Sequence, residues 1–279
     1  MAGNVIISNI LDGIPEDSPI GTEVATISLD AADVSIVSAT VKVFTVIIPD
    51  SEFEETRYIA SDAFEIIGSK IVLKSAVNFE WTGQDRIAVY YSFDVEARLS
   101  DGTTVEGHVR NTVTDVMEEI RGTGKADTIS GTIGMDSIIG GPGNDNISGD
   151  EGDDIIYGGT GGDKLSGDFG SDTFVYKSIK ESTVKNPDTI FGWDHRPNDS
   201  NRDVIDLREI DARADYSGNQ PFKWMGTQSF DGKKGELRYT YDKDSNKTHI
   251  YADTDGDRKA DFQIDLYGKI KMYADDFLL

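Results

Sequence analysis

Six consecutive nonapeptides occupy residues 122–175 and constrain this chain more than any other feature. They read GTGKADTIS, GTIGMDSII, GGPGNDNIS, GDEGDDIIY, GGTGGDKLS and GDFGSDTFV. Position one is always glycine, position six is always aspartate and position eight is always apolar. A flexible Gly/Asp-rich linker would not keep these three residue types in phase through six units. The repeat therefore predicts a regular stacked structure in the middle of the chain.

The periodicity predicts a parallel β-roll. Glycine permits the positive φ angles of a tight turn, so the first six residues of each unit can curl. The last three residues would form a short strand, and two nonapeptides would complete one turn of the roll. Stacked turns would then bury a ladder of position-eight side chains, namely Ile129, Ile138, Ile147, Ile156, Leu165 and Phe174.

The same stacking would align the position-six aspartates. Each carboxylate would lie near that of the unit two further on, and an empty column of such charges would repel itself. Ca²⁺ would instead bind side-chain oxygens and turn carbonyls at about 2.3–2.6 Å, as a hard cation prefers. The predicted ligands are Asp127, Asp136, Asp145, Asp154, Asp163 and Asp172, in turns formed by Gly122, Gly131, Gly134, Gly140, Gly143, Gly149, Gly152, Gly158 and Gly161.

A second acidic motif, D-x-D-G-D-x-x-x-D, lies between two strand-like runs, 248–252 and 262–266. Its acidic residues are Asp253, Asp255, Asp257 and Asp261. Alternate oxygens around a glycine are typical of a loop that wraps one cation, although the spacing is not that of an EF-hand. The motif therefore predicts a calcium-binding loop, and a solvated acidic hairpin turn is the alternative.

Residues 1–117 have a different composition, with many β-branched residues and few glycines. Apolar and polar residues alternate from Ile87 to Leu99, which predicts a half-buried strand. Val105, Val109 and Val113 continue the pattern after a Ser-Asp-Gly turn. Further strands are expected at 23–29, 34–48 and 71–73. About seven strands in this length favour a two-sheet sandwich.

Composition excludes several classes of protein. A formal net charge of −24 is far too acidic for a nucleic-acid binder. The absence of cysteine removes disulfides and thiolate chemistry. No apolar run approaches the roughly 18 residues of a membrane span, and the first residues lack the features of a signal peptide. His108, His195 and His249 are far apart and form no H-E-x-x-H motif, and we predict no catalytic residues.

The nonapeptides resemble those of the RTX (repeats-in-toxin) family of secreted bacterial proteins. Residues 181–212, with the segments Pro-Asp-x-Ile and Asp-x-Ile-Asp-Leu, are similar to the C-terminal domain that follows the roll in serralysin-type proteins. The last four residues, Asp-Phe-Leu-Leu, resemble the uncleaved type I secretion signal of that family. The resemblance implies export by type I secretion machinery and a secreted protein, extracellular or associated with the cell surface.

The N-terminal region resembles a cadherin-like domain. The segment PEDSPIGT at 15–22 is similar to the opening of cadherin repeats. DAFEI at 62–66 and NFE at 78–80 fall where those repeats carry a D-x-F-x-I strand and an acidic ligand motif. The resemblance implies candidate calcium ligands at Glu16, Glu80 and Asp115. The closing motif departs from the usual Asn/Asp run, and no second cadherin repeat follows.

We therefore expect an all-β chain of three domains. These are a cadherin-like β-sandwich at 1–117, a calcium β-roll at 118–176 and a serralysin-type C-terminal domain with a secretion signal at 177–279. The expected function is a calcium-dependent adhesin or lectin-like protein that binds an extracellular polysaccharide or a cell surface. The alternative is a hydrolase of extracellular polymers, or an accessory module of one, and a membrane-inserting toxin is disfavoured because no long apolar segment is present.

Overall fold

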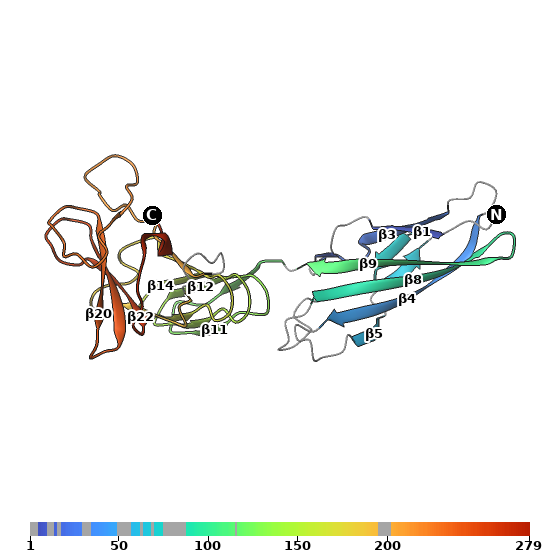
Figure 1. The fold of residues 1–279 in the computed structure, drawn as a ribbon, viewed down its shortest axis with the longest axis horizontal. Helices are drawn as coiled ribbons and strands as arrows, with labels where there is room; N and C mark the ends of the chain where they lie inside the picture. Colours follow the sequence, from blue (N-terminus) through green and yellow to red (C-terminus); the bar gives the residue numbers. More distant parts are fainter. Residues whose placement is uncertain are drawn as a thin grey trace. The chain divides into compact units, whose positions relative to one another are not determined.

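The computed structural model describes the greater part of the chain as two compact units, Met1–Val116 and Met117–Leu279. The residues that it describes are 5–9, 14–15, 18–29, 35–48, 57–61, 64–67, 70–74, 88–114, 116–194 and 202–279. Nearly all regular structure in this part of the chain is β-strand, and the exception is a short 3₁₀ helix, η2 (Ala274–Asp276). The predicted all-β class is confirmed (Figure 1).

Two β-sheets make up the N-terminal unit. One has the strand order β1-β3-β7-β6 and the other the order β2-β9-β8-β4-β5. Their bounds are β1 (Val5–Asn9), β2 (Ile14–Pro15), β3 (Glu23–Leu29), β4 (Ile36–Ile48), β5 (Arg57–Ser61), β6 (Phe64–Ile67), β7 (Lys70–Leu73), β8 (Ala88–Leu99) and β9 (Thr104–Thr114). The strands expected from the sequence are therefore present, with ends that differ by no more than two residues.

The alternating pattern of β8 explains how the two sheets meet. Phe93, Val95, Ala97 and Leu99 are buried, whereas the residues between them are exposed. Phe93 packs edge-to-face on Phe64 of β6 in the other sheet, with ring centroids 4.9 Å apart. One hydrophobic cluster thus joins both sheets, which is the architecture of a β-sandwich.

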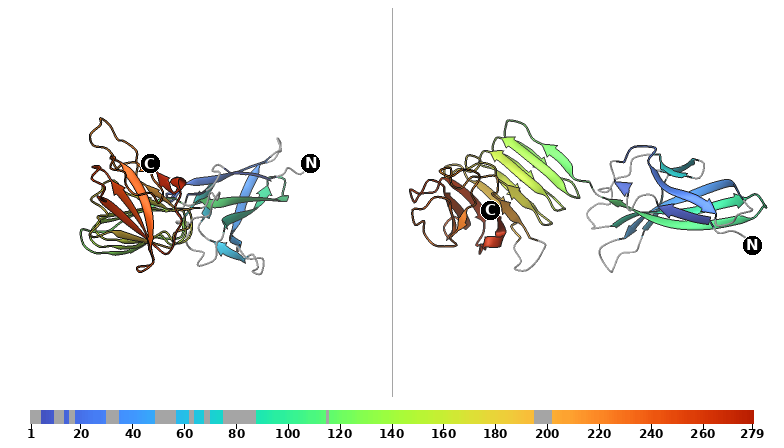
Figure 2. Two further views of the ribbon diagram at one scale, coloured as in Figure 1. Left: turned by 60° about the vertical axis from the view of Figure 1, so that its left-hand side comes forward. Right: turned by 90° about the horizontal axis from the view of Figure 1, so that it is seen from above.

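The C-terminal unit is built on a parallel β-roll, as the repeat predicts. Strands of the odd nonapeptides pair in one sheet and strands of the even nonapeptides in another (Figure 2). The register joins residues 18 apart, so Ile129 lies beside Ile147, and Ile138 beside Ile156. The strands are β10 (Glu118–Arg121), β11 (Thr128–Ser130), β12 (Asp136–Pro142), β13 (Asn146–Ser148), β14 (Ile155–Thr160), β15 (Lys164–Ser166) and β16 (Thr173–Val175).

Position-eight side chains form the interior of the roll. Ile138, Ile156 and Phe174 are fully buried, and the three from the odd units are at most 9% exposed. Burying a branched apolar side chain contributes roughly 1.5–3 kcal/mol. This inner ladder, rather than helix or long-strand propensity, holds such short strands in place.

Both sheets continue past the last nonapeptide. β17 (Asp188–Phe191) pairs with β15, and β18 (Val204–Asp206) pairs with β16, both in parallel. The sequence prediction divided roll and C-terminal domain at residue 176, whereas in the structure both fall within one compact unit. The remaining strands are β19 (Lys223–Trp224), β20 (Glu236–Asp242), β21 (Lys247–Asp253), β22 (Phe262–Tyr267) and β23 (Phe277–Leu278).

The last strands close the stack. β22 pairs in parallel with β17 and carries the antiparallel pair β21 and β20, while β23 pairs in parallel with β18. Trp224 connects these two ends, because its ring stacks on Tyr239 of β20 and also contacts Phe277 of β23. The core of the roll is thereby continuous with that of the C-terminal strands.

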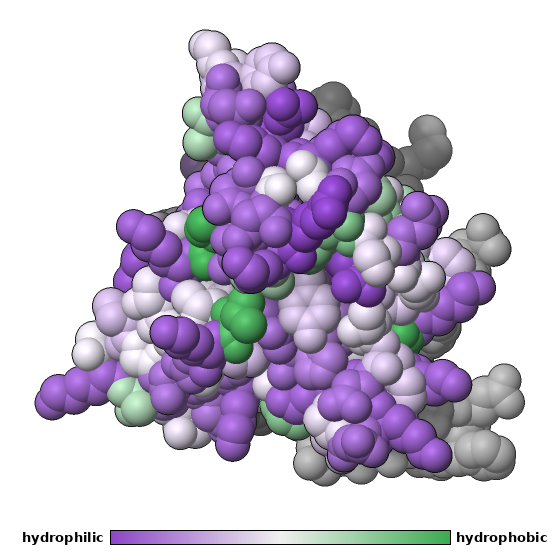
Figure 3. Space-filling model, turned by 90° about the vertical axis from the view of Figure 1, so that its left-hand side faces the viewer, coloured by the Kyte–Doolittle hydropathy of each residue, from purple (hydrophilic) through white to green (hydrophobic). Residues whose placement is uncertain are grey.

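The surface of this unit agrees with the acidic composition. On the face shown in Figure 3, hydrophilic residues predominate and apolar residues form small separate spots. Among the described residues, no helix is long and apolar enough to cross a membrane.

Candidate calcium sites

Two columns of aspartates follow the turns of the roll, one column for each sheet. In each column, Oδ1 of an aspartate accepts a hydrogen bond from the backbone N–H of the aspartate 18 residues earlier. The distances are 2.8 Å from Asp127 N to Asp145, 2.9 Å from Asp136 N to Asp154, 2.8 Å from Asp145 N to Asp163 and 3.0 Å from Asp154 N to Asp172. The position-six side chains are therefore fixed by the coil that precedes them.

The second carboxylate oxygen is left open in the middle of each column. Oδ2 of Asp145, Asp154, Asp163 and Asp172 is buried and has no hydrogen-bond partner, and each of these residues is 1% exposed. A buried carboxylate oxygen without a partner is costly. A hard cation would remove this cost, so the residues present fit Ca²⁺.

The position-one glycines leave room beside these oxygens. A Cβ atom added at Gly140 would lie 2.5 Å from the carbonyl oxygen of Gly158 and 2.6 Å from Oδ2 of Asp145. At Gly158 an added Cβ would lie 2.6 Å from Oδ2 of Asp163. The space that glycine keeps free is thus bordered by a carboxylate and a turn carbonyl, which are the oxygen donors that Ca²⁺ binds.

The other predicted glycines have related surroundings. At Gly122, Gly131 and Gly149, an added Cβ would approach the carbonyl of the glycine 18 residues later and the aspartate of the same unit. At the position-four glycines Gly143, Gly152 and Gly161, it would approach the carbonyl of the residue 18 earlier. Gly134 has a φ of +130°, which favours glycine. Close stacking of the turns therefore explains the glycine pattern.

Burial changes the acidity of the column. It raises the pKa of Asp154 to about 7, and the neighbouring carboxylates of Asp172 and Asp136 add to this effect. Burial likewise raises the pKa of Asp163 and of Asp172 to about 6 each. Without a cation these groups hold protons more strongly than an ordinary aspartate, and Ca²⁺ must displace those protons to bind.

The first two aspartates differ from the rest. The backbone N–H of Thr123 donates to Oδ2 of Asp127, and that of Thr132 donates to Oδ2 of Asp136, both at 2.6 Å. The hydrogen bonds from Thr123 lower the pKa of Asp127. At these two positions a backbone N–H binds the carboxylate oxygen that has no hydrogen-bond partner in the later aspartates.

Two aspartates that the sequence prediction did not include extend the columns. Asp163 N–H donates to Oδ1 of Asp188 at 2.8 Å, and Asp172 N–H donates to Oδ1 of Asp203 at 3.2 Å. In the sequence, TVKNPDTIF at 183–191 and NDSNRDVID at 198–206 keep Asp at position six and Ile at position eight but lack the glycines. The Asp-x-Ile spacing was the signal that could have identified them.

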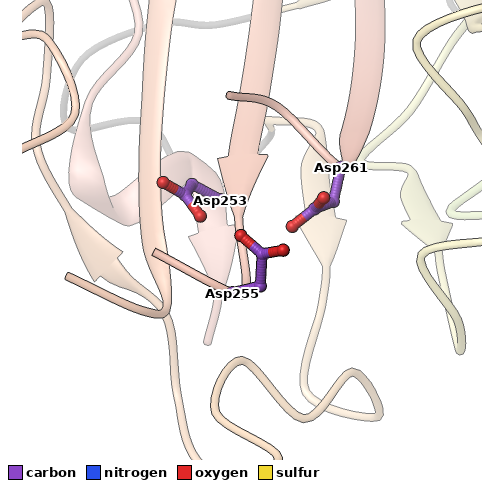
Figure 4. Close-up of side chains that lie close together, drawn as sticks. All are labelled: Asp253, Asp255 and Asp261. Carbon is purple, nitrogen blue, oxygen red and sulfur yellow. The ribbon is translucent and has the colours of Figure 1, made fainter. Parts of the chain in front are cut away.

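The acidic loop after β21 gathers three of its four predicted ligands. Carboxylate oxygens of Asp253, Asp255 and Asp261 lie within 4.8 Å of one another, between the end of β21 and the start of β22 (Figure 4). Asp257 is outside this group, and its carboxylate forms a salt bridge of 2.9 Å with Lys259. Asp253 is fully buried, whereas Asp255 is exposed.

Backbone amides hold this loop in shape. Asp253 accepts hydrogen bonds from the N–H groups of Gly256 at 2.6 Å and Arg258 at 2.8 Å. Asp261 accepts from both the N–H and the hydroxyl of Thr254, at 2.8 and 2.7 Å. The carboxylates can therefore converge before a cation arrives, and their oxygens suit Ca²⁺.

The other candidate ligands and the three histidines lie outside these two motifs in the sequence. Glu16, Glu80 and Asp115 lie outside the described residues, as does His195. His108 pairs with Asp94 on the exposed face of the N-terminal unit. His249 pairs with Asp265 at 2.7 Å in the C-terminal sheet.

The greater part of the chain matches a known protein family. Residues 105–279 match the family described as Peptidase M10 serralysin C terminal. Similar solved structures include the AlgE6R3 and AlgE6R2 subunits of the mannuronan C5-epimerase from Azotobacter vinelandii. The first is 26% identical and covers 56% of this chain and 80% of that chain, with a TM-score of 0.41. The second is 24% identical and covers 57% of this chain and 91% of that chain, also with a TM-score of 0.41. Among curated proteins, none matches the chain.

The family match supports the RTX character predicted from the nonapeptides, together with calcium binding and type I secretion. It includes all six repeats, the acidic loop and the strands that close the stack. Since the match extends over more than half of the sequence, the protein belongs to the Peptidase M10 serralysin C-terminal family.

Proposed function

We propose that this protein is a calcium-dependent adhesin or lectin-like protein that acts outside the cell. The observation that carries its calcium dependence is the set of buried, unpartnered Oδ2 atoms at Asp145, Asp154, Asp163 and Asp172. Burying these oxygens without a partner destabilises the folded roll, and binding a cation stabilises it. Calcium therefore acts as part of the fold.

The mechanism is linkage between ion binding and folding. In a cytoplasm poor in calcium, the buried carboxylates disfavour the closed roll, which keeps the chain open for export. Extracellular modules bind Ca²⁺ with dissociation constants of about 10⁻⁴–10⁻³ M, so roughly millimolar calcium outside the cell fills such sites. Because only the folded chain offers the sites, binding stabilises the fold.

The N-terminal unit is the proposed binding module. It has its own hydrophobic core and falls in a compact unit separate from the roll, which supports a separate role. Its two-sheet sandwich suits the cadherin-like assignment, and Glu16, Glu80 and Asp115 are its proposed calcium ligands. An extracellular polysaccharide or a cell surface is the proposed partner, by analogy with cadherin-like modules of secreted proteins.

We also propose that the role is not catalytic. The described acidic clusters follow the repeat or close a hairpin loop, where they serve calcium binding and folding. The hydrolase alternative predicts release of reducing ends from extracellular polysaccharides in calcium, with saturation in substrate. Absence of such release alongside retained binding would favour the adhesin.

The experiment that tests the proposal is a calcium titration of the full chain followed by far-UV circular dichroism, from EGTA to several millimolar Ca²⁺, with Mg²⁺ as the control. A cooperative gain of β-structure specific to Ca²⁺ is expected. The same preparation is then tested for binding to polysaccharides and cell surfaces in calcium and in EGTA. A chain that is folded in EGTA and indifferent to calcium contradicts the proposal.

A further inference from the structure

The aspartates of the two columns fall into two classes by the state of Oδ2. In Asp145, Asp154, Asp163, Asp172 and Asp188 this oxygen is buried and has no hydrogen-bond partner. In Asp127, Asp136 and Asp203 it accepts a backbone N–H, from Thr123, Thr132 and Asp194 respectively. The two classes do not coincide with the nonapeptide repeat, since units one and two are closed and Asp188 lies beyond unit six.

The residue at position two of each unit explains why Oδ2 accepts a backbone N–H in units one and two. In units three to six the residues at this position have positive φ, and they are Gly141 (101°), Asp150 (78°), Gly159 (94°) and Asp168 (65°). Units one and two have Thr123 and Thr132 there, which are not among the residues with positive φ. A β-branched residue disfavours that conformation. The threonine amide instead faces the aspartate of its own unit and takes the position that a cation would need.

Asp188 belongs to the class with an unpartnered Oδ2, although its segment lacks the glycines of the nonapeptides. It is fully buried, its backbone N–H is held by the Ser182 hydroxyl at 2.8 Å, and its Oδ1 accepts from Asp163 as in the regular units. Burial raises its pKa to about 8. Asp188 is therefore held by hydrogen bonds like the nonapeptide aspartates, and its Oδ2 has no backbone donor.

A buried tyrosine adds a further oxygen beside Asp188. Tyr176 is 2% exposed, and its hydroxyl lies beside the carboxylate of Asp188. Burial raises the pKa of Tyr176 well above its usual value, and the charge of Asp188 and a hydrogen bond to it add to this effect. Together with the open Oδ2 of Asp163 on the adjacent coil, Asp188 and Tyr176 supply an oxygen-only set, which suits a hard cation.

The far end of the other column is closed. Asp203 accepts from Asp172 N–H through Oδ1 and from Asp194 N–H through Oδ2, the latter at 2.7 Å. This column therefore ends at Asp172, whereas the column of the odd units reaches Asp188.

We infer that the calcium column is offset from the nonapeptide repeat: it begins at the third unit and ends at Asp188, where Tyr176 completes an additional site. The inference rests on the proposed calcium-dependent fold and adds to it which carboxylates bind ions. Asp127 and Asp136 are structural hydrogen-bond acceptors, and Asp188 is a calcium ligand.

Native mass spectrometry of the full chain in Ca²⁺ tests the offset by counting bound ions. Asp188→Asn keeps an oxygen that can accept from Asp163 N–H and removes the charge, and one fewer ion than in the wild type is expected. Asp127→Asn is the matched control at the head of the same column, and the wild-type count is expected. Loss of an ion in the control together with a full count in Asp188→Asn overturns the inference.

A gain-of-site variant covers the case in which Asp188→Asn does not fold. Thr132→Gly gives unit two the position-two residue of units three and five, while Gly134 already has positive φ. The amide is then free to turn away from Asp136, and one ion more than in the wild type is expected. An unchanged count in a folded Thr132→Gly chain contradicts the offset. A wild-type chain that binds no calcium contradicts the proposed function itself, so the two failures are distinguishable.

Discussion

The roll and the loop after β21 are both rich in aspartate, but their carboxylate oxygens differ in hydrogen bonding. In the roll, Asp154 and Asp163 each have one oxygen bound by the preceding coil and one buried oxygen without a partner. In the loop, both oxygens of Asp253 accept backbone N–H groups. We therefore expect the roll to need an ion for its stability, whereas the loop is expected to keep its shape and bind an ion afterwards. Similar composition would then produce two kinds of calcium dependence.

Calcium removal should have the largest effect and should act on the roll. An excess of 100-fold over the dissociation constant contributes about 2.7 kcal/mol per site, so four sites contribute on the order of 10 kcal/mol. That is comparable to the whole stability of a typical domain, about 5–15 kcal/mol. EGTA is expected to lower the stability of residues 117–279 by about this amount, and with it the melting temperature followed by circular dichroism. A melting temperature unchanged by EGTA would contradict the difference between the two regions.

Without calcium, the paired substitutions Asp154→Asn and Asp253→Asn should change the stability of the fold with opposite signs. Without calcium, Asp154→Asn removes a buried charge and should stabilise the fold by about 1 kcal/mol. In calcium it also removes a site worth about 2.7 kcal/mol, so the net effect should be a destabilisation of about 1–2 kcal/mol. Asp253→Asn places an amide against two N–H donors and should cost about 1–3 kcal/mol without calcium, and more in calcium because the loop site is also lost. Urea unfolding with and without calcium measures these changes. Destabilisation by Asp154→Asn in the absence of calcium would remove the distinction.

Acidity should have a smaller effect, again through the roll. The folded-state pKa values of about 7 for Asp154 and about 6 for Asp163 lie above the value of about 3.9 expected when unfolded. The calcium-free fold therefore binds protons that the unfolded chain does not, and its stability falls as pH rises from about 4 to 8. Lowering the pH from 8 to 5 should stabilise the calcium-free chain and weaken calcium binding. Urea unfolding at both pH values in EGTA checks the sign, and greater stability at pH 8 would show it to be wrong.

The smallest effect is expected from Asp255→Asn. This side chain is exposed and contributes an oxygen to the cluster, and the hydrogen bond that it accepts from Asp257 N–H at 2.9 Å is exposed as well. A several-fold weaker loop site and an unchanged melting temperature in EGTA are expected. Calcium titration of the variant by calorimetry measures the first, and Asp257→Asn, outside the cluster, is the control. Equal weakening by both variants would show that proximity within the cluster does not select the ligands.

The sequence allowed the roll to be predicted because three residue types keep one period. Gly140, Asp145 and Ile147 each have a separate physical role, in the turn, the column and the core, and the structure shows all three. Asp188 and Asp203 were not predicted as part of the columns, because inserted residues interrupt the period and glycine is absent from their turns. Long-range pairing with β15 and β16 restores the register, and the Asp-x-Ile spacing is the local signal that remains.

The loop and the hydrogen bonds from Thr123 and Thr132 show a second limit of prediction from the sequence. Spacing alone placed Asp253, Asp255, Asp257 and Asp261 in one motif, but in the structure Asp257 pairs with Lys259 and lies outside the cluster of the other three. Spacing likewise made Asp127 and Asp136 equivalent to the later aspartates. The difference arises from the backbone conformation at position two, which becomes visible only with the hydrogen bonds.

The 18-residue register also restricts how a chain of this kind can change in length. Odd units belong to the sheet that ends in the β20–β21–β22 hairpins, and even units to the sheet that ends in β23. Removing one nonapeptide would exchange the two sheets for every unit on one side of the deletion and would present each closing strand with the wrong partner. Removing two adjacent nonapeptides would shorten the stack by one coil and keep every pairing, because each coil contacts only its neighbours. Insertions and deletions should therefore be tolerated in pairs of repeats, a parity rule imposed by the geometry of the roll.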